Sequence, residues 1–124
     1  DIGDAMSTLK ADTIQSTGGG AATLTKQQAA KVWGLTTSAA AITASFNLSS
    51  GTDNGTGDYS YSLSNAFSSA NFAMTAISSG TGAGKICTSN TGRKTASVVA
   101  IEIENHDGSA NDQNQELNAH GDLA

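Results

Sequence analysis

A two-residue period of apolar and polar side chains marks the middle of the chain. In residues 42–48 the apolar side chains occupy the even positions, and in residues 59–63 Tyr and Leu alternate with Ser. Between these segments the chain is dense in Gly, Asn and Asp, and Asn54 followed by glycine can adopt a positive φ easily. The pattern predicts a β-hairpin whose two strands are joined by a loop over residues 49–58.

The same alternation recurs toward the C-terminus. It is found in residues 72–77, 85–88, 95–104 and 113–120, and loops are expected at 78–84 and 105–113. In the longest segment Val99, Ile101 and Ile103 fall on one face, opposite two glutamates, and in the last segment Leu117 points inward. About six short antiparallel strands at this spacing predict a mainly β protein, with a compact antiparallel β-sandwich head over residues 35–124.

One segment favours a helix. Residues 25–34 begin with Thr25, which forms a capping-box pattern with Gln28, continue with good helix formers, and end at a glycine. Trp33 would lie on the apolar face of this short helix and anchor it to the β-domain or to a neighbouring subunit. Residues 1–24, which a glycine triplet interrupts, are expected to be an extended N-terminal segment.

The apolar side chains are too few for a large core. Hydrophobic residues make up 37% of the 124 residues, but many of them are Ala, and aromatic residues are only 5%. A large side chain contributes about 1.5–3 kcal/mol when it is buried, whereas ordering each residue costs about 1–2 kcal/mol of backbone entropy. Contact between subunits would supply the missing burial, and we therefore expect an obligate homo-oligomer.

The net charge limits the classes of molecule that the protein can bind, and the single cysteine excludes an internal disulfide. Six Lys and Arg oppose eleven Asp and Glu, for a net charge of −5, so the sequence lacks the basic surface that nucleic acid attracts. No apolar run approaches the roughly 18 residues of a membrane span, and we expect a soluble protein with no membrane insertion. Cys87 has no partner for an internal disulfide, and it is expected to be a small buried or half-buried side chain.

No constellation in the sequence indicates catalysis, a metal or a cofactor. The His-carboxylate pairs at 106–107 and 120–122 lack the tight ligand spacing of a zinc site. Asp53 begins a short Asp-Asn-Gly run that does not match a calcium loop and suits the expected turn instead. The sequence therefore predicts a non-enzymatic protein with no catalytic, metal-binding or cofactor-binding residue.

Several phrases resemble a family of short structural proteins of marine bacteriophages, cyanophages and pelagiphages among them. These phrases are Met6–Gln15 (MSTLKADTIQ), Ala29–Trp33 (AAKVW), Ser45–Ser50 (SFNLSS), Thr52–Tyr59 (TDNGTGDY) and His120–Ala124 (HGDLA). The resemblance implies a virion protein, trimeric, with an extended N-terminal part and a β-rich C-terminal head, and it makes Met6 the natural start, with residues 1–5 an upstream extension. It carries over no catalytic or binding residue. The stretch 34–41 departs from the family's pattern and leaves the path from helix to sandwich open.

The leading hypothesis is a tail-fibre or spike protein that contacts the host surface, a glycan or an outer-membrane protein, through its loops. Its other partners would be further copies of itself and other virion proteins. The candidate surface contacts are Trp33, Asp53, Asn54, Tyr59 and Tyr61. A capsid decoration or head-fibre protein is the first alternative. A stand-alone carbohydrate-binding module, with a sugar site lined by Trp33, Tyr59 or Tyr61, is a further alternative, and a depolymerase ranks last.

Overall fold

The computed structural model describes residues 15–19, 30–80 and 84–122. The described part contains eight strands and no helix. The strands are β1 (Val32–Thr36), β2 (Ile42–Phe46), β3 (Leu48–Gly55), β4 (Asp58–Leu63), β5 (Ala73–Ser78), β6 (Lys85–Ser89), β7 (Val98–Asn105) and β8 (Gln115–His120). The mainly β fold expected from the alternation is confirmed, with more strands than the six or so that it indicated.

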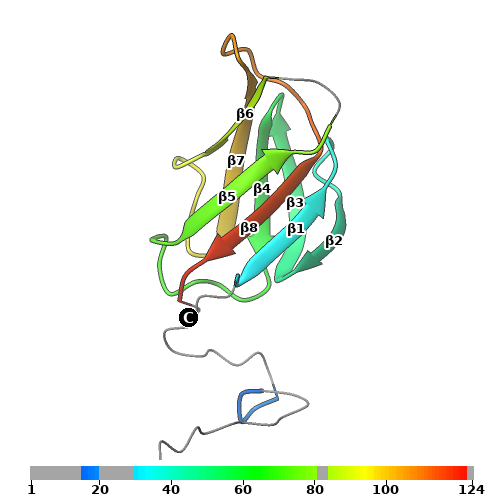
Figure 1. Cartoon of the computed structure of the whole chain (residues 1–124). Coiled ribbons are helices and arrows are strands. Elements are labelled where there is room, and N and C mark those ends of the chain that lie inside the picture. Colours follow the sequence, from blue (N-terminus) through cyan, green and yellow to red (C-terminus); the bar gives the residue numbers. More distant parts are fainter. Residues whose placement is uncertain (1–14, 20–29, 81–83, 123–124) are drawn as a thin grey trace, which may run out of the picture.

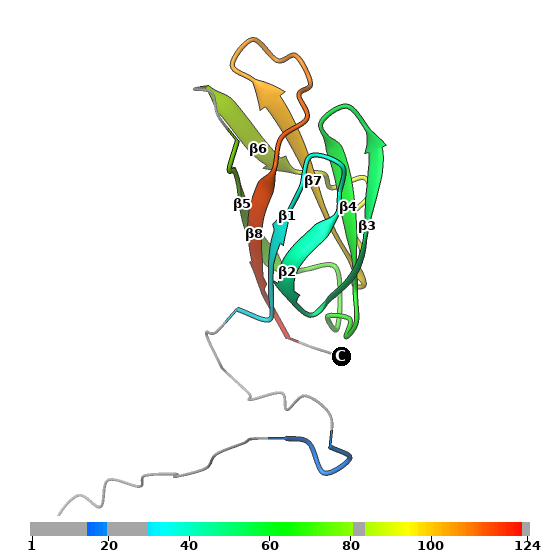
Figure 2. The same cartoon turned by 90° about the vertical axis from the view of Figure 1, so that its right-hand side faces the viewer.

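The strands form two four-stranded antiparallel sheets, in the orders β2-β1-β8-β5 and β3-β4-β7-β6. The sheets pack face to face as the two layers of a sandwich (Figures 1 and 2). The predicted hairpin is β3 and β4, and β7 is the long strand that pairs with both β4 and β6. Edge strands β5 and β6 lie on one side of the sandwich, and the chain crosses between the sheets from β2 to β3 on the other.

The core lies between the two sheets and follows the two-residue period. On β7 the predicted inward residues Val99, Ile101 and Ile103 are all fully buried, and Leu117 of β8 is 4% exposed. The other large members of the core are Val32, Tyr59, Tyr61, Leu63, Phe67 and Phe72. The rings of Phe67 and Phe72 stack with their centroids 4.3 Å apart and close one end of the core.

Asn47 carries the chain from one sheet to the other. Its φ of +64° lies in the left-handed region, which Asn adopts more readily than most residues. Its side-chain amide donates to the carbonyl oxygens of Asn65, at 2.9 Å, and Lys31, while its Oδ1 accepts from the Asn65 amide at 2.7 Å. The sharp reversal thus separates residues 42–48, expected as one strand, into β2 and the start of β3.

A buried polar cluster joins the two sheets inside the core. Gln115 of β8 is fully buried, and its Oε1 accepts hydrogen bonds from the hydroxyls of Thr36, at 2.6 Å, and Tyr61. The Thr36 and Tyr61 hydroxyls also lie 2.9 Å apart. Because Tyr61 belongs to the opposite sheet, these bonds tie β4 to β1 and β8.

The expected helix at 25–34 is wrong at its C-terminal end. Val32 to Gly34 belong to β1, in which buried and exposed residues alternate. Antiparallel pairing with β2 on one side and β8 on the other supplies the backbone hydrogen bonds that a helix would otherwise supply, so tertiary pairing overrides a helix propensity of a few tenths of a kcal/mol per residue. Residues 25–29 lie outside the described residues, as does most of the expected extended segment 1–24.

The loop expected over 49–58 is also largely wrong. Residues 49–55 continue β3, and the connection to β4 is confined to Thr56 and Gly57. Polar residues such as Ser49, Ser50 and Thr52 occupy the exposed positions of this edge strand. A strand with solvent on one face does not need apolar side chains there, so the sequence resembles a loop.

Candidate functional site

The two ends of the sandwich differ in what they present. The described chain enters the sandwich beside the end of β8, where the Lys31 amide donates to the Ala119 carbonyl oxygen at 2.8 Å. The opposite end, which we call the distal end, is formed by residues 37–41, 55–58, 79–80 and 106–114 (Figure 1). Of the loops expected at 49–58, 78–84 and 105–113, the described residues 55–58, 79–80 and 106–113 therefore lie at this one end.

Hydrogen bonds hold the distal residues in place. Asp112 accepts at one oxygen, Oδ1, from the Gly57 amide at 2.7 Å and from the Tyr59 hydroxyl at 2.9 Å. The Asn114 side chain accepts from the Ser38 amide at 3.0 Å, and its carbonyl oxygen accepts from the Ser79 amide at 2.9 Å. Four segments that are distant in sequence are thus fixed relative to one another.

A shallow polar depression of about 390 Å³ lies among these segments. It is lined by Ser38, Ser79, Gly80, Asp112, Gln113 and Asn114. Hydroxyl, amide and carboxylate groups with backbone around them offer both donors and acceptors to a hydroxyl-rich or peptide ligand. The distal depression is therefore the first of two candidate contact surfaces.

Two of the predicted contact residues, Asp53 and Asn54, lie near this end. Asp53 is exposed, and its carboxylate accepts from the Gly55 amide at 3.0 Å, while the half-buried Asn54 donates to the Ser60 hydroxyl at 2.9 Å. Both side chains form hydrogen bonds within the hairpin, but they lie in β3 and not in the turn expected there.

Tyr59 and Tyr61 are not surface contacts. Both are fully buried, because their positions on β4 point between the sheets, and the serines at 60 and 62 point outward. The sequence shows that the tyrosines share a face of the strand, but it cannot show which face the second sheet covers.

Burial raises the pKa of both tyrosines. For Tyr59 the hydrogen bond to Asp112 and the charge of that carboxylate raise it further, and for Tyr61 burial is the main cause. Protonated phenols are therefore part of the folded core, and Tyr59 couples the core to the distal loops.

We expect the protein to lose stability in alkaline solution. Because the folded pKa values lie above the unfolded value of about 10, this stabilisation is complete below about pH 10 and is lost as pH rises through the folded values. Urea titrations at increasing pH should show the loss. Since the chain has only these two tyrosines, tyrosinate absorbance should rise together with unfolding. A tyrosine that ionised near pH 10 in the folded protein would contradict this.

The second candidate surface is the solvent side of sheet β2-β1-β8-β5, which we call the outer face. Its strand register sets two rows of outward side chains. One row runs Phe46, Trp33, Asn118, Thr75, and the other Ala44, Leu35, Glu116, Ile77. The four large apolar members are well exposed, with Trp33 and Leu35 at 42%, Phe46 at 48% and Ile77 at 59%.

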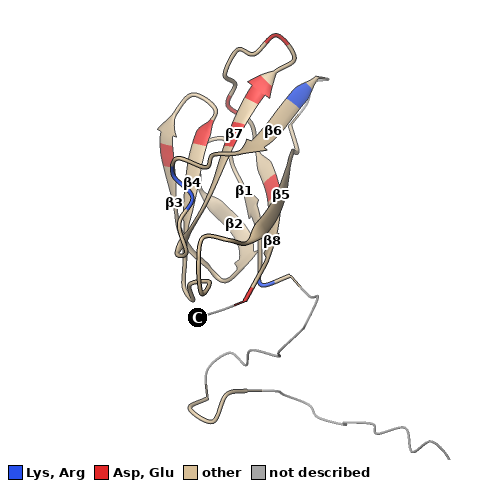
Figure 3. Cartoon of the chain, turned by 90° about the vertical axis from the view of Figure 1, so that its left-hand side faces the viewer, with Lys and Arg blue, Asp and Glu red and all other residues tan. Residues whose placement is uncertain are grey.

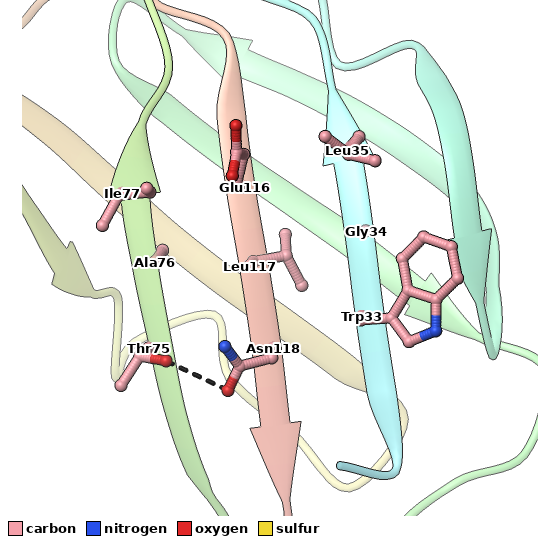
Figure 4. A pocket seen from close by; sticks show the side chains of 9 residues that line it. All are labelled: Trp33, Gly34, Leu35, Thr75, Ala76, Ile77, Glu116, Leu117 and Asn118. Carbon is pink, nitrogen blue, oxygen red and sulfur yellow. Dashed lines mark hydrogen bonds between the residues drawn. The ribbon is translucent and has the colours of Figure 1, made fainter.

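A shallow depression of about 340 Å³ follows β8 across this face, between Trp33 and Leu35 on one side and Ile77 on the other (Figure 4). The Thr75 hydroxyl donates to Asn118 Oδ1 at 3.0 Å inside it. The sequence identifies Trp33 as a candidate contact, but not its neighbours Leu35, Phe46 and Ile77. Alternation assigns Phe46 to the same face as Ile42, and only the pairing with β1 shows that Phe46 is exposed.

The two sheets differ in how many charged side chains their strands carry (Figure 3). Within the four strands of the outer-face sheet, Glu116 is the only Asp, Glu, Lys or Arg. The strands of the other sheet carry Asp53, Asp58, Lys85, Glu102 and Glu104. The outer face is therefore largely apolar and nearly uncharged, whereas the solvent side of the other sheet is charged. An exposed apolar patch of this kind is typical of a surface that binds a partner.

The remaining candidates for chemistry are dispersed. Among the described residues no three His, Cys, Asp or Glu side chains gather as metal ligands would. Cys87 is half-buried on β6, as expected, and burial raises the pKa of its thiol. No helix in the described part has the length and apolarity needed to cross a membrane.

Comparisons of the chain with protein-family models, with curated proteins and with solved structures find no match. By its fold the described part of the chain is a small antiparallel β-sandwich.

Proposed function

We propose that this chain is a structural protein of a bacteriophage virion, of the tail-fibre or spike type, which attaches to the host surface through the distal end of its β-sandwich. The observation that carries the proposal is the placement of the polar loops. Residues 55–58 and 106–114 lie together at the end farthest from the point where the described chain enters the sandwich. The phage-like phrases of the sequence support the same role.

The position of the loops, at the opposite end from the N-terminal side of the sandwich, suits an appendage of a particle. The N-terminal side would face the particle, and the loops would face outward, where exposed loops on a rigid scaffold commonly carry recognition. The distal depression is built by hydrogen bonds from four segments, such as those of Asp112 and Asn114, so its donors and acceptors are held in place before a ligand arrives.

We further propose that the protein acts as a homo-oligomer, a trimer in the leading interpretation. The small core of the described part supports association, because contact between copies would bury more apolar surface. Several copies on one particle would also multiply weak contacts with a host surface, since linked sites bind with high effective concentration.

The test is binding of the labelled protein to a panel of marine bacteria. We expect retention on at least one strain, and at least a tenfold loss of binding for Ser79→Arg, because the new side chain would fill the distal depression. Ser68→Arg is the matched control, since Ser68 is exposed in the loop between β4 and β5, at the other end of the sandwich.

Two results would count against the proposal. One is retention on no strain, and the other is undiminished binding by Ser79→Arg. Copy number in purified virions separates the capsid-decoration alternative, because hundreds of copies per particle would favour decoration over an appendage.

A further inference from the structure

We propose that the outer face is a second binding site, separate from the distal loops, and that it binds an uncharged glycan. The site consists of Trp33 and Leu35 on β1, Glu116 and Asn118 on β8, and Ile77 on β5, at the depression along β8 (Figure 4).

The first argument is the mixture of groups. The aromatic side chain of Trp33 is exposed, and such a ring can cover the C–H face of a sugar while its indole N–H remains a donor. Beside it across the strand pair stands Asn118, and beside Leu35 stands Glu116. A ligand that has both an apolar face and a rim of hydroxyls fits this arrangement, and a sugar ring has both.

The second argument concerns hydrogen-bonding capacity. Thr75 occupies Asn118 Oδ1, which leaves the Asn118 amide N–H groups as donors toward the depression. Glu116 is exposed, and its carboxylate accepts no hydrogen bond from any described residue. One strand thus presents a donor and an acceptor about 7 Å apart, on the same face, as residues two apart on a strand do.

The third argument is charge. With Glu116 as the only charged side chain among the lining residues, the surface repels anionic ligands and has no cation to hold a phosphate, sulfate or uronate. The carboxylate can instead accept hydrogen bonds from sugar hydroxyls. This selects neutral glycans over acidic ones.

The fourth argument is size. Two rows on four strands span about 14 Å across the sheet and about 7 Å along it between Cα positions. A short oligosaccharide matches these dimensions.

Trp33 is the only tryptophan in the chain and therefore reports on its own site. We expect its fluorescence to change on titration with at least one of four neutral tetrasaccharides (chitotetraose, cellotetraose, maltotetraose and mannotetraose), at micromolar to millimolar concentrations, and not with polygalacturonate. Calorimetry on variants, which does not depend on Trp33, should show at least a tenfold loss of affinity for Trp33→Ala and a three- to tenfold loss for Glu116→Gln.

Ile86→Ala is the matched control, since Ile86 is 48% exposed on the other sheet, and it should bind as the parent protein does. Circular dichroism establishes that each variant is folded. Binding of no neutral tetrasaccharide, or equal binding by Trp33→Ala, would overturn the inference. So would light scattering that shows Trp33→Ala converting an oligomer to monomers without any sugar binding, because the face would then be a subunit contact. The result of the cell-binding test with Ser79→Arg does not depend on whether the outer face binds a glycan.

Discussion

Gly51→Ala is expected to unfold a large fraction of the protein. A Cβ on Gly51 would overlap the carbonyl oxygen of Ala40 and would lie 2.9 Å from Cε1 of Tyr61. The first neighbour is backbone and the second belongs to a fully buried ring, so neither can move aside by a simple rotamer change. Ala40 is itself constrained, with a φ of +60° and 4% exposure.

We expect this substitution to lower the free energy of unfolding by about 3 kcal/mol or more, and Tm by more than about 10 °C. Urea and thermal unfolding followed by circular dichroism measure both. Gly92→Ala is the control, because a Cβ there meets only Asn90 Oδ1 at 3.4 Å in an exposed turn, and its effect should stay below about 0.5 kcal/mol. Similar stabilities for the two variants would show that β3 and Ala40 do not approach this closely.

Gln115→Leu is expected to be strongly destabilising, although the two side chains are similar in size. It removes the acceptor shared by the Thr36 and Tyr61 hydroxyls in a fully buried position. Each buried polar group left unsatisfied costs about 1–3 kcal/mol. The two hydroxyls can still bond to each other at 2.9 Å, so we expect a loss of about 2–4 kcal/mol in total.

The triple variant with Thr36→Val, Tyr61→Phe and Gln115→Leu tests the cause. When all three side chains become apolar, neither hydroxyl is left without an acceptor, and much of the lost stability should return, although the Thr37 and Gln113 carbonyl oxygens still lose the Gln115 amide. Unfolding free energies of the single and triple variants in urea decide the matter. A triple variant less stable than Gln115→Leu would mean that packing, rather than unsatisfied hydrogen bonding, explains the single variant.

The fold class and the inward face of the best strands can be read from the amino-acid sequence alone. The two-residue period places Val99, Ile101 and Ile103 in the core, and the turn residues around Asn54 correctly pair β3 with β4. These features are local, because alternation and turn residues are properties of a few consecutive positions. For the same reason the sequence indicates the connections that follow β5 and β7, although not that residues 79–80 and 106–114 lie at one end.

Pairing between strands that are distant in sequence, by contrast, decides where a local helix propensity is overridden and which side chains are exposed to solvent. The residues before Gly34 suit a helix in isolation, but β2 and β8 pair with them as a strand. Tyr61 is buried, whereas Phe46 is exposed, and both follow the same alternation. Whether a strand face is covered depends on a sheet formed by residues far away in sequence, so the outer face around Trp33 emerges only when β1 lies between β2 and β8.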